Sequence, residues 1–253
     1  MADRRTVSVP SGRGVSDVVG FVLIFSLIIA TVGIVYTTGL TGLQDARDAE
    51  RLSNAETAFG VLDSNAEDIL HRGAPARATE IKLSNAQIGP GEPVTVNVTA
   101  GPNASVSREI TPVVYSAGDT KIVYVNGAVI RSQRGGASML DPPNLHLGQR
   151  ALVPIVDTYF PAPKTIGGQT RALVRLDVPT ASDRTVTAFR PTNDTVTVTV
   201  TTTRPGPWNR YFTARGSSCS ESPVNGTYTA VACDVTSVQT VAVSRTNVHV
   251  RLN

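Results

Sequence analysis

Charged residues are missing from one long stretch near the start of the chain, and cysteine is scarce throughout. No Asp, Glu, Lys or Arg occurs between Asp17 and Asp45, and the chain has only two cysteines. The 23 basic residues nearly balance the 20 acidic ones, so the net charge is +3. Nucleic-acid-binding proteins carry a clustered basic surface, and a balance this even argues against one. We therefore expect no nucleic-acid partner.

Sequence signatures of catalysis are also missing. The chain has no G-x-S-x-G motif and no phosphate-binding loop, and His71, His146 and His249 show no metal-ligand spacing. Asp141 and Asp157 lie in or beside long loops, where scattered carboxylates are usually solvated. We therefore expect no enzyme activity, no metal and no cofactor, and a secreted enzyme has no residues to support it.

The uncharged stretch is long enough to cross a membrane. Its strongly apolar part, Val18 to Tyr36, spans roughly 28 Å as a helix. A secretion-signal core is shorter, at about 7–15 residues, and is normally followed by a small-residue cleavage pattern that is not evident here. Arg4, Arg5 and Arg13 precede the stretch, so the positive-inside rule predicts a cytoplasmic N-terminus and an extracellular remainder. The sequence thus predicts a single-pass protein of the cell membrane.

A helical pattern continues beyond the apolar stretch. Apolar and small residues recur every three or four positions from Leu43 to Leu70, with charged residues on the other faces. "HRGAP" at 71–75 places glycine and proline where a helix should end. We expect one helix over residues 15–72, membrane-spanning in its first half. Its stripe would pack either on the protein's own domain or on neighbouring subunits.

From residue 76 to residue 253 the pattern is that of a β domain. The segments that read as strands are 80–88, 93–100, 195–203 and 238–252. In "KIVYVNGAVIR" (121–131), a turn at Asn126-Gly127 would place Tyr124 opposite Val129 and Val123 opposite Ile130. Gly-Pro segments such as "RPGP" (204–207) would separate strands. The predicted class is α+β, with a long N-terminal helix before an antiparallel, sandwich-like extracellular domain.

Three groups of residues in the β domain are candidates for modification or contact. Cys219 and Cys233 can form a disulfide across a short loop in an oxidising compartment. "PWNRYF" (207–212) is the densest aromatic cluster, and its aromatic residues would either form an exposed partner contact or pack under the sheet. Those aromatic residues are Trp208, Tyr211 and Phe212. Asparagines in N-x-S/T sequons, candidates for glycosylation, are Asn97, Asn103, Asn193 and Asn225.

The front of the chain resembles the archaeal type IV pilin-like proteins, especially haloarchaeal ones with a class III signal peptide. The matching residues are Arg13-Gly14, then Val15-Ser16, then the apolar run. "VNGAVIRSQRGGASM" (125–139) is also similar to a group of membrane-anchored haloarchaeal proteins. The resemblance covers the first 70 residues well and the β domain loosely.

The resemblance implies a leader over residues 1–14, removed by a prepilin-type peptidase between Gly14 and Val15. The helix would remain attached and pack with like subunits or other pilins in a surface filament. Asp17 stands where many haloarchaeal pilins have proline, and Val19 stands where bacterial major pilins have glutamate. A minor-subunit role is therefore at least as well supported as a major one. The alternative is an unprocessed single-pass anchor whose β domain binds or adheres to an envelope component.

Overall fold

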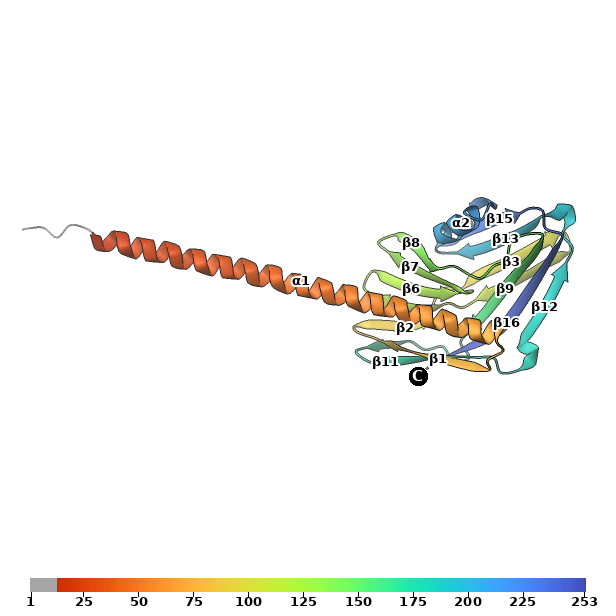
Figure 1. Cartoon of the computed structure of the whole chain (residues 1–253), viewed down its shortest axis with the longest axis horizontal. Helices are drawn as coiled ribbons and strands as arrows, with labels where there is room; N and C mark the ends of the chain where they lie inside the picture. Colours follow the sequence, from red (N-terminus) through yellow and green to blue (C-terminus); the bar gives the residue numbers. More distant parts are fainter. Residues whose placement is uncertain (1–12) are drawn as a thin grey trace, which may run out of the picture. The chain divides into compact units, whose positions relative to one another are not determined.

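The first element of the structure is a long helix, α1 (Arg13–His71), drawn in red and orange in Figure 1. The computed structural model describes the backbone of residues 13–253 and, position 45 apart, the side chains from residue 17 onward. The helix ends where the sequence predicts. Gly73 adopts a left-handed φ of +70°, and the Ala74 N–H donates to the carbonyl of Asp68. One long N-terminal helix is confirmed.

The chain divides into two compact units, Met1–Leu52 and Ser53–Asn253, and α1 contributes to both. The elements after α1 are mostly strands. In chain order they are β1 (Ala76–Lys82), β2 (Ala86–Pro90), β3 (Val94–Gly101), β4 (Ala104–Ile110), β5 (Val113–Ala117), β6 (Thr120–Val125), β7 (Ala128–Gln133), β8 (Gly136–Asp141), β9 (Arg150–Tyr159), β10 (Ile166–Gly168), β11 (Arg171–Asp177), the 3-10 helix η1 (Ala181–Asp183), β12 (Arg184–Phe189), the 3-10 helix η2 (Thr192–Asp194), β13 (Val196–Thr202), α2 (Pro205–Thr213), β14 (Ser218–Pro223), β15 (Thr229–Val235) and β16 (Thr240–Leu252).

The strands form three sheets. The first has the order β1-β11-β16-β12, with β9 also paired to β16; the second has the order β10-β2-β5-β6-β7-β8; the third has the order β14-β15-β13-β3-β4. Among the described strands only β9 and β16 run parallel. The α+β class and the mostly antiparallel β domain are confirmed, whereas the sandwich arrangement is not.

The hairpin of β6 and β7 has the predicted register. Val123 pairs with Ile130 and Tyr124 pairs with Val129. Asn126 and the glycine after it both have positive φ angles, of 50° and 72°. That is the conformation of a two-residue type I′ turn, which matches the twist of the strands it joins.

Two predicted segments have a different structure. Residues 80–88 are not one strand, because Asn85 has a φ of 57° and separates β1 from β2. "RPGP" does not simply separate strands, since Pro205 occupies the start of α2. Proline is well suited to that place, because the first helical N–H has no partner within the helix.

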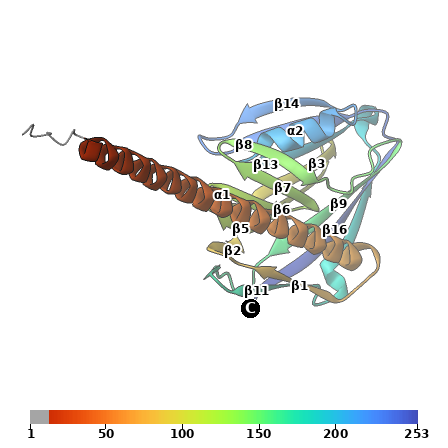
Figure 2. The same ribbon diagram turned by 60° about the vertical axis from the view of Figure 1, so that its left-hand side comes forward.

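A large hydrophobic core lies on one face of the second sheet. Alternate residues of β6 and β7 meet the inward-facing valines of β3, β13 and β15, and α2 closes the core. Figures 1 and 2 both place α2 beside β13 and β8. Residues of this core include Val96, Val98, Val123, Val125, Ile130, Val198, Val200, Trp208, Phe212 and Val231.

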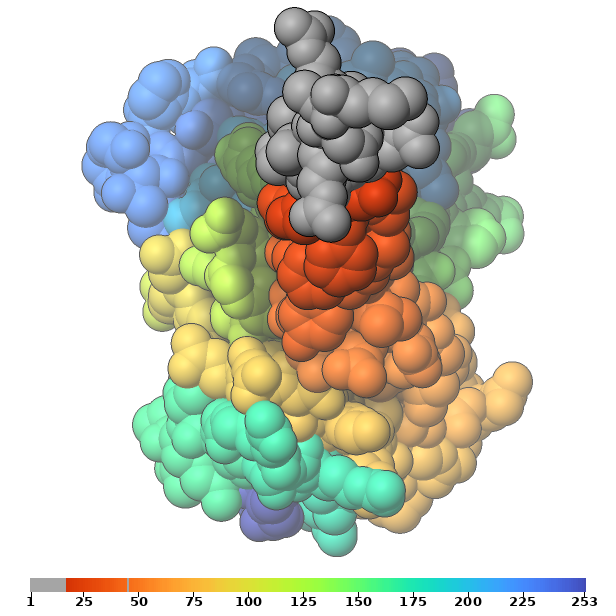
Figure 3. All heavy atoms as spheres, turned by 90° about the vertical axis from the view of Figure 1, so that its left-hand side faces the viewer, coloured from red at the N-terminus to blue at the C-terminus, as the bar shows by residue number. Residues whose placement is uncertain are grey.

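The opposite face of the second sheet is covered by the last part of α1, from Ser53 onward. The rings of Phe59 on the helix and Tyr115 on β5 lie 6.5 Å apart in an edge-to-face arrangement. Glu56 and Arg131 form an ion pair of 3.0 Å beside them. In Figure 3 the orange atoms of this segment lie beside the yellow atoms of the strands that follow it. The buried helix residues are Ala55, Phe59, Leu62, Ala66 and Ile69.

The predicted stripe is therefore divided. From Ala55 onward it packs on the protein's own domain and ends at Ile69, whereas Leu70 is only half-buried. Leu43, at the start of the stripe, is 60% exposed. Only the second half of the stripe has its partner within the described chain.

Replacing Phe59 by alanine tests how much this packing stabilises the domain. Phe59 is fully buried, so Phe59→Ala leaves a cavity and should lower the free energy of unfolding by about 3–5 kcal/mol. Chemical unfolding of the full chain in a non-ionic detergent, followed by circular dichroism, measures the change. Val61→Ala is the matched control, because Val61 lies on the same helix and is 48% exposed. Equal losses in the two variants would show that the helix does not pack as described.

Candidate functional site

The apolar segment of α1 is exposed along its whole length. Every large apolar side chain from Val18 to Leu43 has between 47% and 71% of its surface exposed. The helix is long and apolar enough to cross a membrane. A contiguous apolar surface of this size is unfavourable in water, so this segment requires lipid or another protein around it.

Four threonine hydroxyls within the segment have partners on the helix backbone. The hydroxyls of Thr31, Thr37, Thr38 and Thr41 each donate to a backbone carbonyl three or four residues earlier in the helix. A hydroxyl without a partner in hydrocarbon costs several kcal/mol, and these internal bonds remove that cost. Tyr36 lies at the end of the most apolar part, where aromatic rings often mark the membrane–water interface. The segment therefore suits a bilayer.

The predicted processing site falls at the start of α1. Residues 1–12 of the predicted leader lie outside the described residues. Arg13, Gly14 and Val15 are described only as the first helical backbone of α1, and their side chains lie outside the described part of the chain. Cleavage between Gly14 and Val15 stays a prediction.

Three of the four sequon asparagines lie on exposed turns. Asn103 is in the β3–β4 turn, Asn193 is in η2, and Asn225 is in the β14–β15 turn. The Asn225 side chain accepts hydrogen bonds from the N–H groups of Thr227 and Tyr228. Asn97 is half-buried in the middle of β3, so its amide is much less accessible to a modifying enzyme than the other three.

Of the two alternatives for the aromatic cluster, the structure bears out burial and contradicts an exposed partner contact. Trp208, Tyr211 and Phe212 are buried on the inner face of α2, with 1%, 6% and 0% of their surfaces exposed. The Tyr211 hydroxyl donates to the carbonyl of Pro143, and the Arg215 guanidinium lies 3.8 Å from the centre of the Tyr211 ring. Helical spacing turns all three rings toward the core, so the cluster anchors α2 and offers no partner surface.

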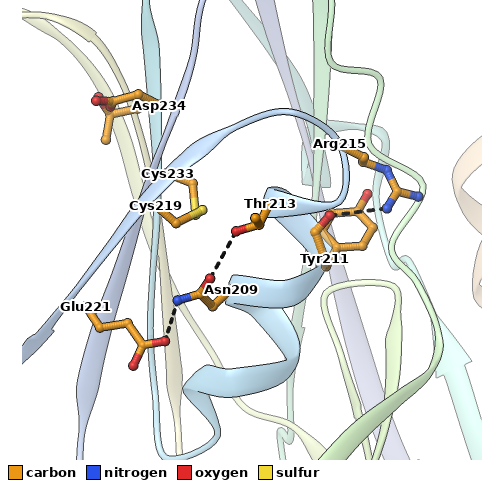
Figure 4. The surroundings of a disulfide bond; sticks show 9 residues. Asn209, Tyr211, Thr213, Arg215, Cys219, Glu221, Cys233 and Asp234 are labelled. Atoms are coloured by element: carbon orange, nitrogen blue, oxygen red, sulfur yellow. Dashed lines mark hydrogen bonds between the residues drawn. A yellow bond between two sulfur atoms is a disulfide. The ribbon is translucent and has the colours of Figure 1, made fainter.

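The structure joins Cys219 on β14 to Cys233 on β15 by a disulfide. The two residues pair directly across the strands. Figure 4 shows α2 beside this bond, where Asn209 donates from its side chain to Glu221 on β14. The disulfide and this hydrogen bond both hold β14, which is one of the two edge strands of its sheet.

Removing the disulfide should destabilise the β domain. The two cysteines have a sequence separation of 14. A disulfide that closes a loop of this length stabilises the folded state by about 3 kcal/mol, mainly by restricting the unfolded chain. The Cys219→Ser, Cys233→Ser double variant should lose that amount in an unfolding titration. The reduced wild type should lose the same amount, and a reductant should leave the double variant unchanged. A double variant as stable as the oxidised wild type would contradict a stabilising role.

Three carboxylates meet where α1 packs on the second sheet. Burial, with Glu67 on the same helix and Asp141 at the end of β8, raises the pKa of Asp63 to about 7. The fully buried Tyr124 lies close by, and burial together with the charges of Asp63 and Glu67 raises the pKa of its phenol well above the ordinary value. Sequence reasoning missed this cluster because Asp141, which is exposed as expected, comes from a distant part of the chain. The cluster makes the helix–sheet contact sensitive to protonation.

Stability should consequently fall as the pH rises. Asp63 has its pKa raised on folding, so its contribution is fully present below about pH 4 and is lost as the pH passes about 7. Asp63→Asn should make the free energy of unfolding less dependent on pH and should raise it at pH 8 by about 1–3 kcal/mol. Chemical unfolding titrations at several pH values between 4.5 and 8.5 measure this free energy in both proteins. Asp48→Asn, at a side chain with 70% of its surface exposed, should keep the wild-type slope. If the stability of Asp63→Asn depended on pH as that of the wild type does, a group other than Asp63 would be responsible for the dependence.

Comparison with known proteins identifies a family. A family model described as "Family of unknown function (DUF7289)" matches residues 13–251, a range that includes α1 and nearly all of the β domain. No curated protein and no solved structure matches the chain. The apolar helix and the β domain are thus parts of one family pattern, and the chain belongs to DUF7289, a family of unknown function.

Proposed function

We propose that this chain is a type IV pilin-like protein of the cell surface, acting as a structural or minor subunit of a filament or of its assembly machinery. Its apolar helix lies in the membrane with the N-terminus in the cytoplasm, and its sandwich-like β domain is displayed outside the cell. The role is structural and not enzymatic.

The continuity of α1 carries this proposal. The helix passes without interruption from the exposed apolar segment to the buried residues Ala55–Ile69 that hold the β domain. A discarded secretion signal is expected to end at a cleavage segment with small residues, after which the mature domain begins. Here the residues after the apolar segment are helical and lead directly into the domain's own packing. A helix that stays attached fits this arrangement better than one that is removed.

The exposed first half of the stripe supports contact with like subunits. Leu43 is 60% exposed, and Ala46 and Ala49, one and two turns further along the same stripe, are also exposed. In a plain anchor these residues would face water. Lateral packing between subunits would cover them, as would extraction of the helices into a filament core.

The alternative function is an unprocessed single-pass anchor whose β domain binds an envelope component. One observation favours it: the β domain already covers its own sheet with the helix from Ala55 to Ile69, so it needs no neighbouring subunit for its core. The exposed sequons Asn103, Asn193 and Asn225 agree with an extracellular, glycosylated domain under either proposal.

The N-terminus of the mature protein distinguishes the two proposals. A type IV pilin-like chain should begin at Val15 after processing, and Arg13→Glu should leave it at full length because the peptidase recognises the basic residue before the cut. Intact mass and N-terminal sequencing of protein recovered from membranes and from sheared surface material measure this. Arg13→Lys is the control, since it keeps the charge and should mature normally.

Each result has a clear meaning. Val15 at the N-terminus of sheared material supports a filament subunit, and Val15 in membranes alone supports a minor or assembly-stage subunit. Met1 or Ala2 at the N-terminus supports the plain anchor. A cut beyond Tyr36 would show a discarded secretion signal and overturn both proposals.

A further inference from the structure

A basic pocket opens beside the start of α2. It has a volume of about 490 Å³ and lies between the β7–β8 turn, the β5–β6 turn and the first turn of α2. A second pocket of about 380 Å³ shares two of its lining residues, Lys121 and Arg204. The two pockets therefore adjoin one another along the surface of the β domain.

Four cationic side chains line the first pocket, against one carboxylate. The cations are Lys121, Arg134, Arg204 and Arg210, and the carboxylate is Asp119. Within residues 13–253, none of these four cations is among the ion pairs of the structure. Of the sixteen other basic residues from residue 17 onward, eight form ion pairs. Four cations around one carboxylate are a local excess of positive charge, which favours an anion.

Arg204 lies at the junction of the two pockets and is half-buried. Its guanidinium donates to the hydroxyls of Ser132 and Thr203, which are neutral groups. Burial lowers the pKa of Arg204, and only the charge of Glu92 and the phenol of Tyr228 act in the opposite direction. Glu92 also lines the second pocket, but the side-chain hydrogen bonds of Arg204 go to hydroxyls. A partly desolvated cation of this kind is stabilised when an anion binds beside it.

Arg134 occupies an unfavourable backbone conformation at the edge of the pocket. Its φ is 50°, and Gly135 after it has a φ of 80°. Asn126 has the same conformation in the neighbouring hairpin, where asparagine is well suited to it. An arginine in this conformation lowers the folding stability by about 1 kcal/mol relative to asparagine or glycine. The shape of the turn therefore does not explain why arginine occupies this position.

The start of α2 adds to the positive potential. Arg204 precedes the helix, and Gly206 in its first turn lines the pocket. Pro205 and Pro207 have no N–H, so the first turn offers few amide donors and acts mainly through the helix dipole. The charged side chains thus provide most of the attraction.

The walls indicate a ligand rich in hydroxyl groups. The first pocket is lined by Ser132, Gln133 and Thr203 and the second by Gln87, Ser116 and Thr165, in each case among glycines and prolines. Neither pocket has the deep apolar recess in which peptide side chains are usually anchored, and neither is lined by an exposed aromatic ring on which a base could stack.

We infer that this pair of pockets binds an acidic polysaccharide, with the carboxylate or sulfate groups of successive sugars held by Lys121, Arg134, Arg204 and Arg210. The inference goes beyond the proposed function, because it assigns a ligand class to the β domain whether or not the chain polymerises.

The test uses the full chain in a non-ionic detergent and measures binding to polygalacturonate, dextran sulfate and neutral dextran. The wild type should bind one or both of the acidic polymers and not dextran, with an affinity that falls as salt rises. The Lys121→Gln, Arg134→Asn double variant should bind at least tenfold more weakly and with a shallower salt dependence. Arg134→Asn suits the turn, so the fold should be preserved, and circular dichroism checks it.

The matched control removes two exposed charges elsewhere. Lys82→Gln with Arg150→Gln lowers the net charge equally and lies outside both pockets. This control should retain the wild-type affinity. Equal losses in the two double variants, or no binding of either acidic polymer by the wild type, would overturn the inference. Displacement of the polymer by micromolar inorganic phosphate would also overturn it, because the site would then hold a single oxyanion.

Discussion

Burial of both faces of one sheet is the constraint on which the rest of the structure depends. The β6–β7 hairpin is apolar on both faces next to its turn, over residues 122–125 and 128–130, so neither face is stable in water there. One face meets the valines of the third sheet and α2, and the other meets Phe59 and its neighbours on α1. The helix is therefore part of the fold of the β domain and not merely a tether to it.

That arrangement links the apolar segment of α1 to the domain. The covering residues Ala55–Ile69 belong to the same helix as the exposed apolar segment, so one continuous helix contains both that segment and the cover of the sheet. The protonation state of Asp63 also matters for the stability of this contact. Asp63 lies where the helix must remain packed, so that a single proton affects a contact on which the second sheet depends.

Features with a local signal were predictable from the sequence. The long helix, its end near Gly73 and the register of the Asn126-Gly127 hairpin all depend on residues close together in the chain. Features that depend on distant residues were missed: the approach of Asp141 to Asp63, and the grouping of Lys121 with Arg204. Whether the aromatic cluster is exposed or buried stayed open, because short-range composition does not determine which way a short helix directs its rings.

The position of the helix contact also determines how the domain carries mechanical load. Tension applied through α1 reaches Ser53 along the helix axis, because the helix is continuous there. The side chains from Ala55 to Ile69 lie along that axis, so a pull shears them together and does not peel them apart one by one. A contact loaded in shear distributes force over all its members. The packing of α1 on the β domain is thus suited to withstand a pull along the helix.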